Sequence, residues 1–299
     1  MDFLPGKTFA LIKEDLLCEY KTIEEPVYSA SPDSTEPAIM HNHNGYEMLL
    51  LLGGEVNFYI GEYGRRLTPG QLICINPYDF HMCEMIDVNE YDRIVVNISE
   101  PLMNSLSTDK TDLTDCFVRN GRFNVIQLSE DAVESFRQYS FGLIDALSSD
   151  EYGSDIMAET YARQILVLAN RQSSEGHAAS RKEMSIMPEL VSETIRYIDR
   201  HLQEEFSIQM LADHLHHNSS YVSRCFKQFA GISLQEFIIN KKISLAQRYL
   251  RDQVPPCDVC FMVGFRNYSN FSRTFSKYSG VSPKQYQRLQ APDVTLPGK

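Results

Sequence analysis

The sequence predicts an α+β protein of two domains: a β-sandwich or barrel with trailing helices, followed by an all-helical domain with two helix-turn-helix units. Three observations predict this division. Short apolar runs such as EMLLLL and QLICI alternate with turn residues up to about residue 128. Apolar residues then recur at three- and four-residue steps, which is the helical period. The net charge of −12 is also divided unequally, because residues 181–290 carry 15 Lys+Arg against 10 Asp+Glu.

The composition is typical of a soluble globular protein, with 43% hydrophobic and 23% charged residues. No apolar run approaches the roughly 18–20 residues that span a bilayer, and the N-terminal stretch lacks the basic flank and apolar core of a signal peptide. The seven cysteines follow no secreted disulfide framework. We therefore expect a cytoplasmic protein without a membrane partner. Cys257 and Cys260 are expected to be small helix residues, neither zinc ligands nor a redox pair.

The β-rich part is expected to cover residues 1–130. Its strands are predicted at 47–52, 55–60, 65–68, 71–75 and 93–98. Gly53-Gly54 and the stretch 61–64 indicate hairpin turns. The stretch Thr68-Pro69-Gly70-Gln71 fits a type II turn, which has Pro at its second position and Gly at its third.

Two helices are expected within residues 131–173. Asp131 has the pattern of a helix cap, with Glu134 three residues later, and Ser154 can cap the second helix. These helices carry enough apolar surface for a dimer interface, but they fit the core of one monomer equally well. Residues 174–187 are rich in Ser and Ala, show no periodicity and are expected to link the two domains.

Residues 188–290 are expected to be helical throughout, with 291–299 as a tail. Capping residues predict where helices start, and glycines predict where they end. Helices are predicted to start after Ser207, after Asn218 or Ser219, and after Ser233, which forms a capping box with Glu236. Two of the helices are predicted to end at Gly231 and Gly280.

Two segments of this basic region repeat one plan at a distance of 49 residues. Each has a short helix, a tight turn, a second helix, and then Gly, a β-branched residue and Ser. The alignment pairs Phe226 with Phe275, Arg224 with Arg273, Gly231 with Gly280, and Ser233 with Ser282. This is the helix-turn-helix plan, whose second helix enters the DNA major groove.

The second helix of each copy separates into an apolar and a polar face. The predicted core residues are Val222, Phe226, Phe229, Phe271, Phe275 and Tyr278. The other face carries side chains that can bind base edges or phosphates. The candidate DNA-binding residues are Ser220, Ser223, Arg224, Lys227, Asn267, Tyr268, Asn270, Arg273 and Lys277. A solvated helix face would account for any one of them, but poorly for two matched copies in the basic region.

The segment CDVCFMVGFRNYSNFSRTFSKYSGVSPKQYQR resembles the signature of the AraC family of bacterial transcription regulators. The resemblance covers about residues 188–290 and rests on Gly264-Phe265, Ser269, residues 271–275, Gly280, Ser282-Pro283 and Tyr286. Cys260 departs from the alanine usual at its position. The resemblance implies two helix-turn-helix units joined by a long helix, about residues 234–251, which bind successive major-groove segments on one face of the DNA.

A second group of chemically active residues lies in the N-terminal half. HNHNGYE contains His41, His43 and Glu47, and NPYDFH adds His81. Three His and one Glu can hold a transition metal. The pattern also resembles the cupin sensory domain common in AraC-type regulators, and in metal-binding cupins these four positions are ligands. In the regulators it implies a pocket without catalysis, and the expected effector-binding residues are His41, His43, Tyr46, Glu47 and His81.

The expected effector is a small polar molecule, with a carbohydrate favoured, because polar groups and aromatic faces together suit a sugar. The candidate aromatic residues are Tyr28, Tyr46, Tyr59, Tyr78 and Tyr91. The resemblance thus implies a ligand-responsive regulator that binds double-stranded promoter DNA, acts as a homodimer and has RNA polymerase as a further candidate partner. No cofactor and no enzyme activity are expected. The alternative is a metal-dependent cupin enzyme fused to a helical DNA-binding domain.

Overall fold

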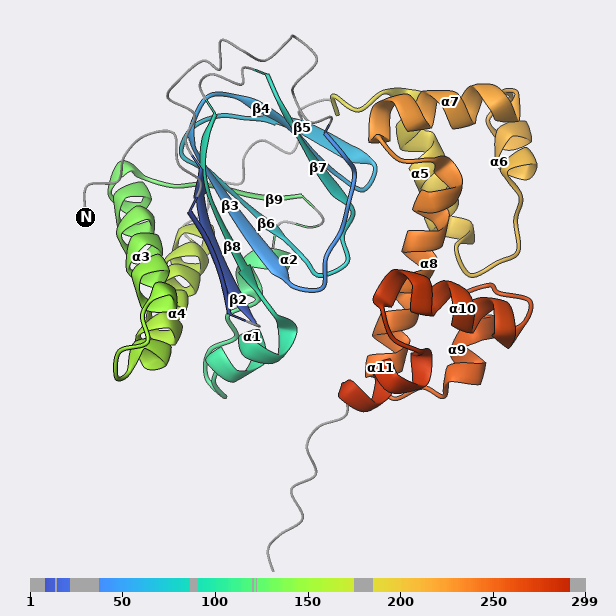
Figure 1. Ribbon diagram of the computed structural model, residues 1–299. Coiled ribbons are helices and arrows are strands. Elements are labelled where there is room, and N and C mark those ends of the chain that lie inside the picture. Colours follow the sequence, from blue (N-terminus) through green and yellow to red (C-terminus); the bar gives the residue numbers. More distant parts are fainter. Residues whose placement is uncertain are drawn as a thin grey trace, which may run out of the picture. The chain divides into compact units, whose positions relative to one another are not determined.

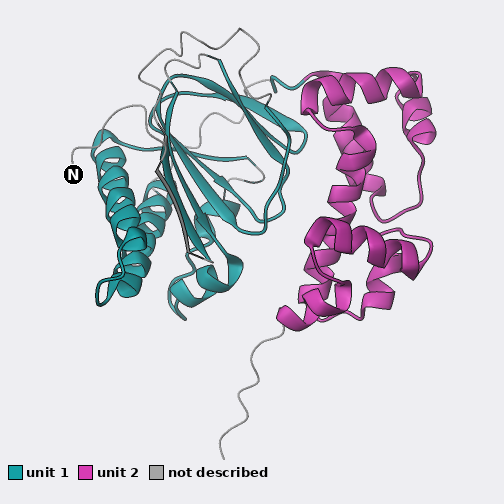
Figure 2. Ribbon diagram, in the orientation of Figure 1, with its two compact units in different colours: residues 1–187 teal, residues 188–299 magenta. Residues whose placement is uncertain are grey.

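The computed structural model describes residues 9–13, 15–21, 38–86, 91–119, 121, 123–174 and 185–290. The chain divides into two compact units, residues 1–187 and 188–299 (Figure 2). Tyr28, residues 175–184 of the expected linker and the tail 291–299 lie outside the described residues. The expected α+β class is confirmed, because the first unit is rich in strands and the described part of the second is helical.

Two antiparallel sheets form the β-rich part of the first unit. The larger sheet has the strand order β1-β2-β8-β3-β6-β9, and the smaller has the order β5-β4-β7. The strands are β1 (Phe9–Lys13), β2 (Leu16–Lys21), β3 (Tyr46–Gly53), β4 (Val56–Ile60), β5 (Tyr63–Leu67), β6 (Gln71–Ile75), β7 (His81–Met85), β8 (Asp92–Ile98) and β9 (Asn124–Gln127).

The strand β3 is buried on both faces, which explains why EMLLLL reads as a continuous apolar run. Successive side chains of a strand point to opposite faces. Met48 and Leu50 therefore join the cluster that packs against the helices of this unit, while Leu49 and Leu51 join the cluster between the two sheets. Phe58 of β4 lies in that second cluster, 1% exposed. The larger sheet is thus the central layer of the unit.

The described residues of this unit also form four helices: α1 (Glu100–Leu106), α2 (Asp115–Val118), α3 (Glu130–Ser148) and α4 (Ser154–Ser174). Of these, only α3 and α4 are expected from the sequence, and they pack against each other beside the larger sheet (Figure 1). The prediction of Asp131 as the cap of α3 is wrong. Ser129 is the cap, and its hydroxyl accepts a hydrogen bond from the backbone N–H of Ala132.

Two of the three predicted turns of this unit are confirmed, and one is wrong. Gly61 and Glu62 connect β4 to β5 as a hairpin, with Ile60 opposite Tyr63. Gly70 has φ +82°, and the N–H of Gln71 donates to the carbonyl of Thr68 (3.2 Å), as a type II turn requires. Gly53-Gly54 is not a hairpin turn, because β3 pairs with β6 and β8 whereas β4 pairs with β5 and β7.

The second unit contains seven helices among its described residues. They are α5 (Glu189–His201), α6 (Ile208–His214), α7 (Ser219–Ala230), α8 (Leu234–Arg251), α9 (Pro256–Met262), α10 (Tyr268–Ser279) and α11 (Pro283–Leu289). The predicted caps Ser207 and Asn218 are confirmed, and Gly231 and Gly280 end α7 and α10 in the left-handed conformation. Ser233 accepts from the N–H of Glu236.

The two helix-turn-helix units lie at either end of α8, which runs from one to the other (Figure 1). Phe226 of α7 packs on Phe237 of α8, with ring centroids 5.0 Å apart. Phe271 and Phe275 of α10 are fully buried beside the other end of α8, as expected for core residues. None of the described helices is both long and apolar enough to cross a membrane.

The crossing of α3 and α4 depends on the glycine at position 142. An ideal Cβ on Gly142 would lie 2.4 Å from Cζ of Tyr161. We predict that Gly142→Ala lowers the free energy of unfolding by about 1–3 kcal/mol, because the added methyl group overpacks this contact. In an exposed helix the same change would stabilise by about 1 kcal/mol. Urea unfolding tests this, and Tyr161→Ala should relieve the loss; a Gly142→Ala protein as stable as the wild type would contradict it.

Candidate functional site

Backbone pairing brings the two halves of the predicted His/Glu cluster together. His41 and His81 form an isolated antiparallel bridge, with N–H to carbonyl distances of 3.0 and 2.8 Å in the two directions. The N–H of Tyr78 also donates to the carbonyl of His43 (2.9 Å). These bonds place the ring centroid of His81 4.4 Å from that of His41 and 5.0 Å from that of His43.

Glu47 lies between two of these histidines. Nε2 of His43 donates to Oε2 of Glu47 (2.7 Å), and Oε1 of Glu47 lies 3.9 Å from Nε2 of His81. The side chains of Glu47 and His81 are 10% and 3% exposed, whereas that of His43 is 29% exposed. The cluster is therefore buried at Glu47 and His81 and opens toward solvent at His43. His41 is exposed beside it.

The orientation of the His81 ring leaves one nitrogen facing Glu47 as a hydrogen-bond acceptor. Nδ1 of His81 lies 2.9 Å from the carbonyl of Asp79, so Nδ1 carries the proton that this contact needs. Nε2 then has a free lone pair. It is buried, and among the described residues it has no hydrogen-bond partner. Phe58 stacks parallel to the ring, with centroids 6.2 Å apart, and helps to hold it in place.

The protonation states follow from burial and from the neighbouring groups. Burial disfavours the charged form of His81 and lowers its pKa to about 4, although the carboxylate of Glu47 acts in the opposite direction. Burial also opposes ionisation of Glu47, but the hydrogen bond from His43 and the nearby imidazoles outweigh it and lower the Glu47 pKa to about 2. At neutral pH the cluster therefore presents a carboxylate and a neutral imidazole, both with lone pairs directed inward.

The structure does not bring Tyr46 to this cluster, in contrast to the sequence-based expectation. Tyr46 precedes Glu47 on β3 and therefore faces the opposite side of the sheet, where its ring lies 4.8 Å from that of Phe117. Tyr59 donates its hydroxyl to Glu84 (3.0 Å). Tyr91 lies in the cluster between the sheets, with its hydroxyl 3.5 Å from Sγ of Cys83.

Two further residues lie beside the His/Glu cluster. Cys83 and Phe58 were not expected there, although Cys83 is two residues after His81 on β7 and therefore shares its face. Burial raises the pKa of the Cys83 thiol, so it is protonated at neutral pH. The alternation along β7 was the signal for Cys83, whereas Phe58 lies on another strand and gave no local signal.

The helices α7 and α10 expose most of the predicted DNA-binding residues. Those exposed are Ser220, Arg224 and Lys227 on α7, with Asn270, Arg273 and Lys277 on α10. Ser223 is partly buried. The guanidinium of Arg224 lies 5.7 Å from the ring centroid of Tyr221, an exposed residue that the sequence analysis did not select. Each helix thus presents a polar, cationic face opposite its buried phenylalanines.

Two predicted contacts of α10 are already engaged within the protein. The side-chain oxygen of Asn267 caps the helix by accepting the N–H of Asn270 (2.8 Å). Tyr268 is partly buried and packs on Phe271, with ring centroids 6.0 Å apart. Burial raises the pKa of the Tyr268 hydroxyl.

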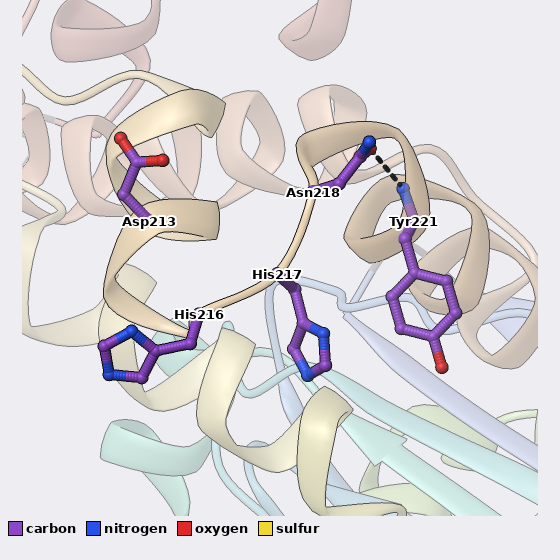
Figure 3. Close-up of a pocket in the computed structure, with 5 residues that line it drawn as sticks. All are labelled: Asp213, His216, His217, Asn218 and Tyr221. Carbon is purple, nitrogen blue, oxygen red and sulfur yellow. Dashed lines mark hydrogen bonds between the residues drawn. The ribbon is translucent and has the colours of Figure 1, made fainter.

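A hollow at the turn between α6 and α7 adjoins the polar face of α7. It is lined by Asp213, His216, His217, Asn218 and Tyr221 (Figure 3). The oxygen of Asn218 caps α7 by accepting from the N–H groups of Ser220 and Tyr221. From the sequence Asn218 is predicted only as a cap, although the neighbouring HLHH run indicates a polar turn.

Comparison with known proteins gives one family match in each unit. Residues 30–166 match the family described as AraC-like ligand binding domain, and residues 211–289 match a helix-turn-helix domain. The chain is 30% identical over 157 residues to the uncharacterized HTH-type transcriptional regulator YobQ of Bacillus subtilis (strain 168), across 48% of this chain and 64% of that protein. It is 30% identical over 110 residues to the melibiose operon regulatory protein of Escherichia coli (strain K12), across 36% of each.

Among solved structures, the C-terminal domain of AraT, a response regulator from Geobacillus stearothermophilus, is 26% identical with a TM-score of 0.36, across 38% of this chain and 97% of that one. The chain spans less than two thirds of the length of the first curated relatives. Both family matches nevertheless fall in the order expected from the sequence, and together they cover most of the chain. The chain therefore carries a domain that matches the AraC-like ligand binding domain, followed by one that matches a helix-turn-helix domain.

Proposed function

We propose that this protein regulates transcription by binding promoter DNA through α7 and α10, in response to a small polar molecule held beside His43, Glu47 and His81. The observation that carries the proposal is the matched pair of helices. Both α7 and α10 have 12 residues, begin after an Asn cap and end at a left-handed Gly. Both expose an Arg at the same position, 49 residues apart. Two such helices on one chain suit two successive major-groove segments.

The effector chemistry is inferred from the lone pairs of the buried cluster. Oε1 of Glu47 and Nε2 of His81 face each other at 3.9 Å, and neither can donate to the other. A ligand that donates one hydrogen bond to each satisfies both, and two neighbouring hydroxyls of a sugar are such donors. The proposal of a sugar is supported by these two inward-facing hydrogen-bond acceptors. The alignment with the melibiose operon regulatory protein covers 36% of the chain and identifies no effector.

A divalent metal ion is the second candidate for this cluster. One ligand atom from each of His43, Glu47 and His81 lies within 4.8 Å of the others, a set of N and O donors that suits a transition metal. Nε2 of His81, which has no hydrogen-bond partner in the part of the chain that the structure describes, is the group that a metal would use. These residues would hold the ion, which would act as a Lewis acid toward an effector oxygen. Metal together with turnover of the effector would instead support the cupin-enzyme alternative.

The first prediction concerns DNA binding. The protein should bind promoter fragments from its own genome with micromolar or tighter affinity, despite the net charge of −12. The affinity should fall about a thousandfold between 50 and 200 mM salt if six or more phosphates are contacted. Fluorescence anisotropy with labelled duplexes measures both. Absence of binding to every promoter fragment at low salt would refute the proposed function.

The second prediction concerns the matched arginines. Arg224→Ala and Arg273→Ala should each cost about 1–3 kcal/mol of binding free energy and relax specificity in one half of the site, a different half for each. Arg137→Ala removes a charge that is also exposed, from α3 in the other unit, and serves as the control, with no change expected. Equal weakening on every DNA sequence would show that the arginine contacts phosphate.

The third prediction concerns the effector. A panel of mono- and disaccharides should include one that stabilises the wild type by about 2.7 kcal/mol at a hundred times its Kd. Glu47→Gln should abolish this stabilisation and the effect of the sugar on DNA binding, while DNA binding itself remains. Glu55→Gln, which changes an exposed carboxylate of the same unit, should respond normally. If elemental analysis finds stoichiometric metal and chelation reproduces Glu47→Gln, the cluster is a metal site.

The fourth prediction concerns pH. The pKa of His81 is about 4 in the folded protein, whereas the unfolded chain has an ordinary histidine near 6.5. The unfolded state therefore binds the proton first, and stability is lost as the pH falls from about 6.5 toward 4. The expected loss from His81 is about 2–3 kcal/mol between pH 7 and pH 4.5. Urea unfolding at several pH values should show this loss in the wild type and a shallower dependence in His81→Gln; equal slopes would contradict it.

A further inference from the structure

Lys242 lies at the middle of α8, and its side chain contacts backbone segments at both helix-turn-helix units. Its Nζ donates to the carbonyl of Gly264 (3.0 Å), in the turn between α9 and α10, and contacts the carbonyl of Glu204 (3.5 Å), between α5 and α6. The ammonium also lies 5.9 Å from the ring centroid of Phe265. The ammonium of Lys242 thus connects the segment that precedes the first helix-turn-helix unit with the turn inside the second helix-turn-helix unit.

Gly264 is required by the same contact. It has φ +74°, and an ideal Cβ there would lie 2.5 Å from Nζ of Lys242, 3.0 Å from the carbonyl oxygen of Glu204 and 3.1 Å from that of Gln203. Only glycine leaves room for the two backbone segments and the ammonium to approach this closely. The turn that precedes α10 is therefore packed directly on the segment that precedes α6.

The residues on either side of Glu204 make the same connection. Nε2 of Gln203 donates to the hydroxyl of Tyr249 on α8 (3.0 Å), and Glu205 forms an ion pair with Arg266. Arg266 directly precedes Asn267, the cap of α10. The ion pair is exposed and weak by itself. Lys242 is half-buried, and burial lowers its pKa, so its bonds to the carbonyls operate in a drier environment.

We propose that Lys242 is a positioning residue for DNA recognition, which fixes the separation of α7 and α10 and thereby the spacing of the two half-sites that the protein accepts. This inference rests on the proposed function. One added base pair moves the second half-site by about 3.4 Å and rotates it by roughly 34–36°. A pair of helices held rigidly cannot follow this change, whereas a pair joined by α8 alone can adjust.

The test uses the full-length protein and a randomised duplex library. Selection with the wild type gives a bipartite site, from which duplexes are made with one base pair added or removed between the half-sites. The wild type should bind the altered duplexes about tenfold or more weakly. This loss of affinity is about what the loss of one well-formed base contact causes. Lys242→Met should bind each isolated half-site like the wild type but show a spacing penalty of only about twofold to threefold. Lys242→Arg, which keeps the charge and the donors, should restore most of the penalty.

Lys241→Met is the matched control. It removes the same charge from the adjacent position, but Lys241 pairs with Asp199 of α5 and contacts Phe237, all on the side of the first helix-turn-helix unit. Its spacing penalty should equal that of the wild type. Thermal unfolding checks that each variant is folded, and Lys242→Gln, which keeps a shorter donor, replaces Lys242→Met if the latter does not fold.

The possible outcomes distinguish a failure of the proposed function from a failure of the role of Lys242. If the wild type selects no sequence, the proposed function fails and the role of Lys242 fails with it. If the wild type selects a bipartite site but a folded Lys242→Met or Lys242→Gln variant keeps the full spacing penalty, only the role of Lys242 is refuted. Uniform weakening on all duplexes with a salt slope lower by about one would also refute it, because that result identifies a phosphate contact.

Discussion

The N-terminal unit depends on the two-residue alternation of side chains along β3. Met48 and Leu50 pack toward the helices, and Leu49 and Leu51 pack between the sheets, so both faces of the strand are buried. Glu47 shares the inner face with Leu49 and Leu51. A register slip of one residue would exchange the two faces and move this carboxylate to the helical side. The apolar residues of β3 therefore fix the place of the charged one.

The same packing explains why a costly polar group persists in the interior. A buried acceptor without a partner costs about 1–3 kcal/mol, and Nε2 of His81 is such a group among the described residues. The bridge between His41 and His81, the contact of Nδ1 with Asp79 and the stacked ring of Phe58 all hold this nitrogen toward Glu47. Rigid support for an unsatisfied acceptor beside a buried carboxylate is the arrangement expected of a preorganised binding site.

Sequence patterns predicted the features that depend on local physics. The caps at Ser207 and Asn218, the glycine ends of α7 and α10, and the main strands are encoded by neighbouring residues. Tyr46 was selected wrongly, although its adjacency to Glu47 implied the opposite face. The short helices α1 and α2, the different sheets of β3 and β4, and the contacts of Lys242 depend on partners far along the chain. No local pattern carries that information.

The sequence repeat in the second unit makes α7 and α10 closely similar helices. Gly231 ends α7 with φ 74° and ψ −18°, and Gly280 ends α10 with φ 75° and ψ −16°. Because the two helices have equal length, the same cap residue and equal ends, we expect that exposed residues can be exchanged between them at an offset of 49 with little disturbance of either backbone. For protein engineering, the exposed residues of α7 and α10 can therefore be treated as two sets to exchange. Under the proposed function, giving both helices the same outer face should convert recognition of two different half-sites into recognition of a direct repeat.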